Sequence, residues 1–131
     1  MNKIIRRIVM AAMLGLVSYQ ASAAEELYSK EYSVCLNNSG GVTVNILECI
    51  SAETEHQDVL LNKAYRDLRA VLTAERKREL LEAQRAWLKY RDLNCKFYAG
   101  SGGTLAAIAS NDCFLKGTAV RAGELKQIPP Y

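Results

Sequence analysis

The chain has 131 residues, a length that predicts a single domain. It holds 17 Lys and Arg residues against 14 Asp and Glu residues, which gives a formal net charge of +3 at pH 7. Three of the basic residues, Lys3, Arg6 and Arg7, lie among the first 23 residues, where no acidic residue occurs. Removing them leaves 14 residues of each sign, so the rest of the chain is nearly neutral. Nucleic-acid binding is therefore not expected, because it requires a basic surface.

Residues 1–23 have the three parts of a secretory signal. The basic residues precede an apolar stretch at 8–18, which is too short to span a bilayer comfortably. Small residues follow at 21–23, and we expect cleavage after Ala23. The expected product is one periplasmic domain, residues 24–131, without stable membrane insertion. An uncleaved membrane anchor is the alternative. No cysteine lies directly after the apolar stretch to accept a lipid, so a lipid-anchored form is not expected.

The spacing of apolar residues predicts three main helices. The first is expected from about Thr43 to Leu72, with a polar first half and apolar residues every three or four positions in its second half. The second is expected from about Ala74 to Tyr98, with Thr73 as its N-cap. The third is expected from near Thr104 to Leu125, and Gly117 is a candidate interruption of it.

These elements predict an all-α fold, a small helical hairpin or bundle of about three main helices stapled by two disulfides. The connection between the first two helices is very short. It predicts either an antiparallel pair of helices or a sharp kink in one long helix.

The chain has four cysteines, and an even count in a small exported protein predicts two disulfides. Cys35 and Cys49 are placed evenly about the Gly40-Gly41 turn, and Cys95 and Cys113 evenly about a glycine-rich stretch at 100–103. Residues equidistant from a turn face each other in antiparallel segments, which favours Cys35–Cys49 and Cys95–Cys113. The rival pairing joins Cys49 to Cys95 and Cys35 to Cys113, and the sequence alone leaves both open.

Residues 82–95, "EAQRAWLKYRDLNC", place polar groups on a helical face that should be buried. Gln84, Trp87, Arg91 and Cys95 follow one another at steps of 3, 4 and 4, so they share one face. A buried guanidinium needs a carboxylate and further acceptors, because an unpaired buried charge is very costly. Polar residues on the facing helix are therefore the expected partners.

Antiparallel packing of the first two helices would bring Arg91 near Glu53 or Asp58. It would also bring Gln84 near Asn62 or Tyr65. We therefore expect an interior polar network that fixes the register of the helices. A polar groove that holds a ligand and a catalytic carboxylate pair are the alternatives. The expected members of the structural polar network are Glu53, Asp58, Asn62, Tyr65, Gln84, Trp87 and Arg91.

The order of these features is similar to that of a known family. Its marks are "DVLLNKAY" at 58–65, "AQRAW" at 83–87, "YRD" at 90–92 and "TAVRAGEL" at 118–125, with cysteines between them. From residue 35 to 125 the chain resembles the LprI-like lysozyme-inhibitor family, small exported helical proteins of bacteria. This chain lacks the lipid-anchor cysteine of the founding type. We carry the motif over as a signature of the fold only.

The resemblance implies a protein-binding module whose partner is a lysozyme or another cell-wall hydrolase. A periplasmic adaptor or immunity-type protein without lysozyme inhibition is the alternative. An enzyme is not expected, because the chain has no Ser/His/Asp order, no lone reactive cysteine and no glycine loop between strand and helix. No cofactor is expected. His56 is the only histidine and has no second ligand type at metal spacing, so we expect a surface residue and no metal site.

The stretch "YAGSGGTL" at 98–105, here named the glycine loop, is the candidate contact with a partner. It would be pinned at its base by a Cys95–Cys113 disulfide, and inhibitors commonly place such a loop in an active-site cleft. An ordinary helix–helix turn is the alternative. A second candidate is an acidic face with Glu53, Glu55 and Asp58, which would attract basic lysozymes. The candidate loop residues are Tyr98, Gly100, Ser101, Gly102, Gly103 and Thr104.

Overall fold

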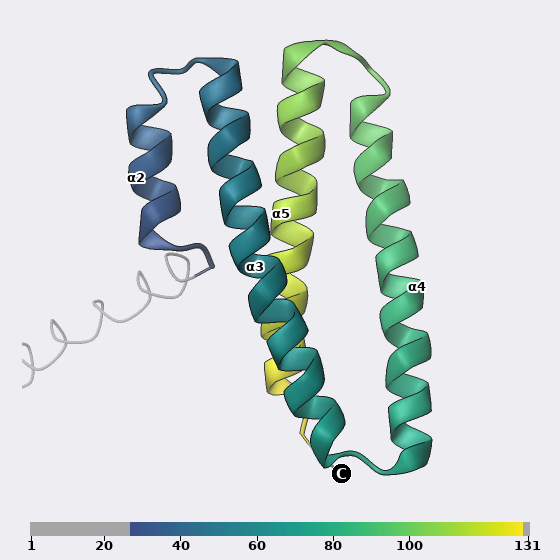
Figure 1. Cartoon of the computed structure of the whole chain (residues 1–131). Helices are drawn as coiled ribbons and strands as arrows, with labels where there is room; N and C mark the ends of the chain where they lie inside the picture. The colour runs from purple at the N-terminus through teal and green to yellow at the C-terminus, as the bar shows by residue number, and fades with distance from the viewer. Residues whose placement is uncertain (1–26, 130–131) are drawn as a thin grey trace, which may run out of the picture.

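The computed structural model describes residues 27–129, which form four helices and no strand. The expectation of an all-α class is confirmed, and the three expected helices correspond to α3, α4 and α5. The short helix α2 was not predicted. The predicted signal and its cleavage after Ala23 lie outside the described residues. The helices, labelled as in Figure 1, are α2 (Lys30–Asn38), α3 (Thr43–Val71), α4 (Ala74–Ala99) and α5 (Gly103–Gln127).

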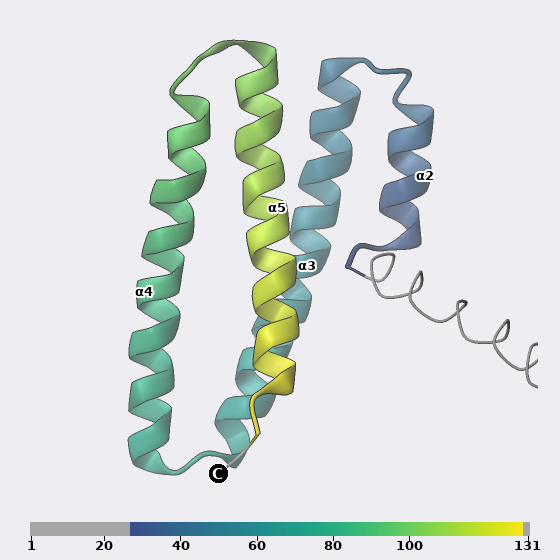
Figure 2. The ribbon, with the colours of Figure 1, turned by 180° about the vertical axis from the view of Figure 1, so that it is seen from behind.

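The central helix of the fold is α5, which packs against both α3 and α4. Views from both sides place it between them (Figures 1 and 2). The helices α3 and α5 run in the same direction, and α4 runs opposite to both. A tight connection at Leu72 and Thr73 joins α3 to α4, but the two helices have little other contact. The antiparallel direction agrees with the sequence, whereas direct packing of α3 on α4 does not occur.

Local signals explain where α4 begins and why α5 is continuous. The Thr73 hydroxyl accepts a hydrogen bond from the backbone N–H of Arg76 at 3.3 Å, so the predicted N-cap is confirmed. The predicted interruption at Gly117 is wrong, because α5 runs through it. A Cβ at Gly117 would lie 3.3 Å from the Cγ atom of Arg91. This glycine therefore gives the Arg91 side chain room to pass over α5.

Two apolar clusters hold the helices together. One joins α3, α4 and α5, and the other joins α2, α3 and α5 near the opposite end. Only Leu80 of α4 belongs to either set of buried residues, which fits the small contact of α4 with the rest of the core. The buried members are Leu61, Ala64, Leu68, Leu80, Ala122 and Leu125 in the first cluster, and Tyr32, Cys49, Ile50 and Leu115 in the second.

The disulfides are Cys35–Cys49, which joins α2 to α3, and Cys95–Cys113, which joins α4 to α5. Their Cα atoms are 5.7 Å and 5.4 Å apart, so the pairing favoured by symmetry about the turns is confirmed. Each disulfide lies beneath a glycine turn, and the two turns occupy the same end of the molecule (Figure 1).

Candidate functional site

The glycine loop is tighter than the sequence suggested. Helix α4 continues through Tyr98 to Ala99, and α5 already begins at Gly103, which leaves residues 100–102 as the connection. The backbone N–H groups of Gly100 and Gly102 donate to the carbonyls of Phe97 and Ala99, both at 3.1 Å. Gly102 and Gly103 have φ values of 71° and 82°, a left-handed region that favours glycine. The loop is therefore a short, defined turn.

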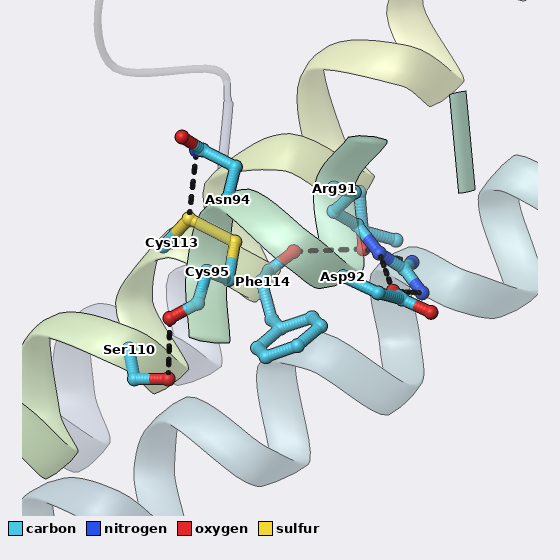
Figure 3. Close-up of a disulfide and its surroundings, with 8 residues drawn as sticks. Arg91, Asp92, Asn94, Cys95, Ser110, Cys113 and Phe114 are labelled. Carbon is cyan, nitrogen blue, oxygen red and sulfur yellow. Dashed lines mark hydrogen bonds and ion pairs between the residues drawn. A yellow bond between two sulfur atoms is a disulfide. The ribbon is translucent and has the colours of Figure 1, made fainter. Parts of the chain in front are cut away.

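The disulfide Cys95–Cys113 closes the base of the glycine loop (Figure 3). The Ser110 hydroxyl donates to the carbonyl of Cys95 at 2.9 Å, and the Asn94 amide donates to the sulfur of Cys113 at 3.5 Å. These contacts and the disulfide tie the last turns of α4 to the first turns of α5. The base of the loop is therefore pinned by the Cys95–Cys113 disulfide, as the sequence predicts.

Large apolar side chains flank the turn at residues 100–102 and point away from the core. Phe97 is 83% exposed and Leu105 is 80% exposed, the two highest values among the large hydrophobic residues of the described chain. The rings of Phe97 and Tyr98 meet edge to face, with centroids 6.4 Å apart. Exposed apolar groups gathered at one place commonly mark a contact with another molecule. Phe97 was not among the predicted loop residues, because helical patterning gave no reason to single out its exposure.

Arg91 is largely buried but does not pair with Glu53 or Asp58. Its side chain is 18% exposed, and its guanidinium donates twice to the carboxylate of the neighbouring Asp92, at 2.9 and 3.0 Å. A third donation goes to the hydroxyl of Thr118 on α5, at 3.2 Å. The predicted partners were wrong, because α5 rather than α3 packs beside α4.

Two aromatic rings enclose the Arg91 guanidinium. The guanidinium carbon of Arg91 lies 5.0 Å from the centroid of the Trp87 ring and 5.4 Å from that of the Phe114 ring. Figure 3 shows the arginine, its carboxylate partner and the Phe114 ring close together beside the disulfide. Cation–π contacts of this kind stabilise a desolvated guanidinium. Trp87 is half-buried and packs at the edge of the core, so it belongs to this cluster and to the apolar core together.

The remaining members of the predicted network are separate. Gln84 is buried and accepts a hydrogen bond from Arg121 of α5 at 3.0 Å, instead of meeting Asn62 or Tyr65. Asn62 donates to Asp58 on the exposed side of α3. Within residues 27–129 the buried hydroxyl of Tyr65 has no hydrogen-bond partner. The single network expected from the sequence is thus replaced by several small ones.

Glu53 holds the segment before α2 against α3. The residue is 3% exposed, and its carboxylate accepts hydrogen bonds from the backbone N–H of Ser29 at 2.9 Å, from the Ser29 hydroxyl, and from the Gln57 amide at 2.7 Å. Gln57 also donates to the carbonyl of Leu27 at 3.2 Å. Burial by itself raises the pKa of Glu53, but these hydrogen bonds from Gln57 and Ser29 outweigh it, and the net pKa is lowered.

The expected acidic face is therefore only partly exposed. Glu55 and Asp58 lie on the surface of α3, whereas Glu53 is buried and cannot contribute. Glu55 and Asp58 line a polar groove of about 440 Å³ whose other walls include Arg91 and Asn111. The two carboxylates belong to α3 and Arg91 belongs to α4, so groups of opposite charge line the two sides of the groove. Asp58 and Arg91, two members of the predicted network, both line this groove, and a groove that holds a ligand stays a prediction.

His56 is exposed, as the sequence predicts. Among residues 27–129 no group of three or more His, Cys, Asp or Glu side chains is placed to hold a metal ion. None of the described helices is long and apolar enough to cross a membrane.

Fold and loop together define a small helical protein, stapled by two disulfides, whose most exposed apolar side chains flank one pinned turn. Comparison with known families identifies the family of this chain. A family model described as "Lysozyme inhibitor LprI" matches residues 35–125, most of the chain, and the protein belongs to this family. No curated protein and no solved structure matches the chain. The family is named for inhibition of an enzyme and not for catalysis.

Proposed function

We propose that the protein acts in the periplasm and inhibits a lysozyme or a similar peptidoglycan-cleaving enzyme. Membership of the LprI family supports the class of partner. The signal predicted at residues 1–23 supports the location, where such enzymes meet the cell wall. In this proposal the glycine loop enters the substrate cleft of the enzyme and excludes the glycan.

The exposure of Phe97 and Leu105, on either side of the turn at residues 100–102, is the observation that carries the proposal. Binding energy in protein complexes is concentrated in a few apolar and aromatic anchors. Phe97 and Leu105 are the candidate anchors here, and both lie beside a turn of only three residues, 100–102, which forms a narrow projection. The disulfide Cys95–Cys113 orders this projection before any encounter, so little conformational entropy is lost on binding.

Charge supports the same kind of partner. Glu55 and Asp58 are exposed on α3, and lysozymes are basic proteins. Complementary charge mainly accelerates the encounter and contributes less to the final affinity. In the proposed complex the acidic residues attract the enzyme, and the glycine loop forms the tight contact.

The experiment is an inhibition screen with residues 24–131 purified in the oxidised form. Lysozymes of several structural types are mixed with the protein, and lysis of a cell-wall suspension is followed by turbidity. The expected result is inhibition of at least one type that saturates near one inhibitor per enzyme. If none of the enzymes is inhibited at large molar excess, the proposal is wrong. A periplasmic adaptor or immunity-type role would then be pursued by co-purification from an envelope extract.

A further inference from the structure

A second groove runs along the opposite side of the α4–α5 hairpin from the acidic residues of α3. It has a volume of about 590 Å³ and is lined by α4 and α5 alone. Trp87, Tyr90, Asn94 and Tyr98 form its α4 wall, at steps of 3, 4 and 4 on one helical face. At about 1.5 Å per residue, the aromatic positions from Trp87 to Tyr98 span about 16 Å. The groove is therefore elongated.

The α5 wall supplies charged groups opposite these rings. Asp112 and Lys116 both line the groove, and no ion pair within residues 27–129 engages either of them. The Asn94 amide nitrogen points at the disulfide sulfur and its oxygen points away from it (Figure 3). The α4 wall, with its rings and the Asn94 amide, thus faces the carboxylate of Asp112 and the ammonium group of Lys116, and Glu124, which pairs with Arg121, adds a second carboxylate to the groove. Sites for small molecules have this composition, with apolar walls and a few placed polar groups.

We propose that this groove binds a linear oligosaccharide. A pyranose ring has an apolar face of C–H groups, which can stack on the exposed rings of Tyr90 and Tyr98, and hydroxyl groups around its edge. Those hydroxyls can donate to Asp112 and Asn94 and accept from Lys116. The guanidinium groups of Arg91 and Arg121 already lie over the Trp87 ring, which leaves the exposed rings of Tyr90 and Tyr98 for stacking. These two rings, about two helical turns apart on one face, fit several linked sugars better than a single one. The proposal stands on the groove residues and does not depend on the inhibition of any enzyme.

Other elongated ligands fit the groove less well. A nucleic acid would place phosphates beside the Asp112 carboxylate, and Lys116 is the only basic residue that lines the groove. A proline-rich peptide also uses aromatic grooves. Proline residues have no N–H donor, however, so such a peptide would desolvate the Asp112 carboxylate without a hydrogen bond in return. Sugar hydroxyls supply that donor.

The test uses the only tryptophan of the chain, Trp87, as a reporter inside the groove. Oxidised residues 24–131 are titrated with β-1,4-linked N-acetylglucosamine hexamer, with the monomer and with a proline-rich peptide, while tryptophan emission is followed. We expect the tryptophan emission to change saturably with the hexamer, at concentrations where the monomer has no effect. No saturable change with the hexamer, or tighter binding of the peptide than of the hexamer, would overturn the proposal.

A matched pair of variants locates the site. Tyr90→Ala removes a 66% exposed ring from the groove, and Leu93→Ala removes a 60% exposed side chain from the same helix outside it. Neither change touches the core, so both variants should fold. Tyr90→Ala is expected to weaken hexamer binding about tenfold, the loss that corresponds to one aromatic contact. Leu93→Ala should bind like the wild type. Equal binding by both variants would exclude this groove.

Discussion

Replacement of Glu53 by alanine should detach the N-terminal segment from α3. Three donors converge on this carboxylate: the backbone N–H and hydroxyl of Ser29 and the amide of Gln57. Each buried donor left without an acceptor costs about 1–3 kcal/mol. Part of this cost is offset, because the carboxylate is no longer desolvated and water can reach Ser29. We expect the free energy of unfolding to fall by about 2–3 kcal/mol.

Urea unfolding at pH 7, followed by far-ultraviolet circular dichroism, measures this loss. Glu55→Ala is the matched control, because Glu55 lies two residues away on the exposed side of the same helix. Its effect should stay within about 0.5 kcal/mol. Hydrogen exchange should accelerate in α2 (Lys30–Asn38) of the Glu53 variant before it does so in α5. The reasoning fails if Glu53→Ala and Glu55→Ala have the same stability.

The same carboxylate predicts a pH dependence. The pKa of Glu53 is lowered in the folded protein, so the unfolded state binds the proton more tightly. Its stabilising contribution is therefore complete above the unfolded pKa of about 4.3 and is lost as the pH falls through the lower folded value. The stability difference between wild type and Glu53→Gln should shrink over that acidic range. A difference that stays constant from neutral to strongly acidic pH would contradict the assignment.

Two further predictions concern Arg91 and the disulfides. Arg91→Ala should lower the free energy of unfolding by about 1–2 kcal/mol. This loss is smaller than for a fully buried ion pair, because the partner Asp92 is exposed. Thermal unfolding measures the loss, and an unchanged melting temperature would refute the prediction. Replacing either disulfide with serines should cost a similar amount, about 3 kcal/mol in the chain-entropy model, because the separations of 14 and 18 residues are close. Only loss of Cys95–Cys113 should also weaken inhibition, and equal weakening by both replacements would argue against the loop as the contact.

Local patterns were sufficient for the long helices and for the pairing of the cysteines. Apolar spacing located α3, α4 and α5 within a few residues, and symmetry about the two glycine turns indicated both disulfides. Helix α2 was missed because it has nine residues and only Tyr32 is buried. A helix so short depends on distant contacts, here with Glu53 and Cys49, which local spacing does not reveal.

The polar partners could not be predicted because they depend on how three helices pack together. The sequence shows that Gln84 and Arg91 share a face, and that face is indeed turned inward. It does not show that α5 lies between α3 and α4. Because of that position, Gln84 forms its hydrogen bond with Arg121 and Arg91 forms one with Thr118, both on α5.

The role of the glycine loop is tested most directly by a pair of double variants in the inhibition assay. Phe97→Ser with Leu105→Ser changes the exposed apolar residues on both sides of the turn at residues 100–102, and Val44→Ser with Val59→Ser changes two exposed apolar residues of α3. Against a lysozyme that the wild type inhibits, the loop variant should be weaker by about 100-fold, as two lost anchors imply. The α3 variant should inhibit like the wild type. Equal inhibition by the two double variants would contradict the proposed contact.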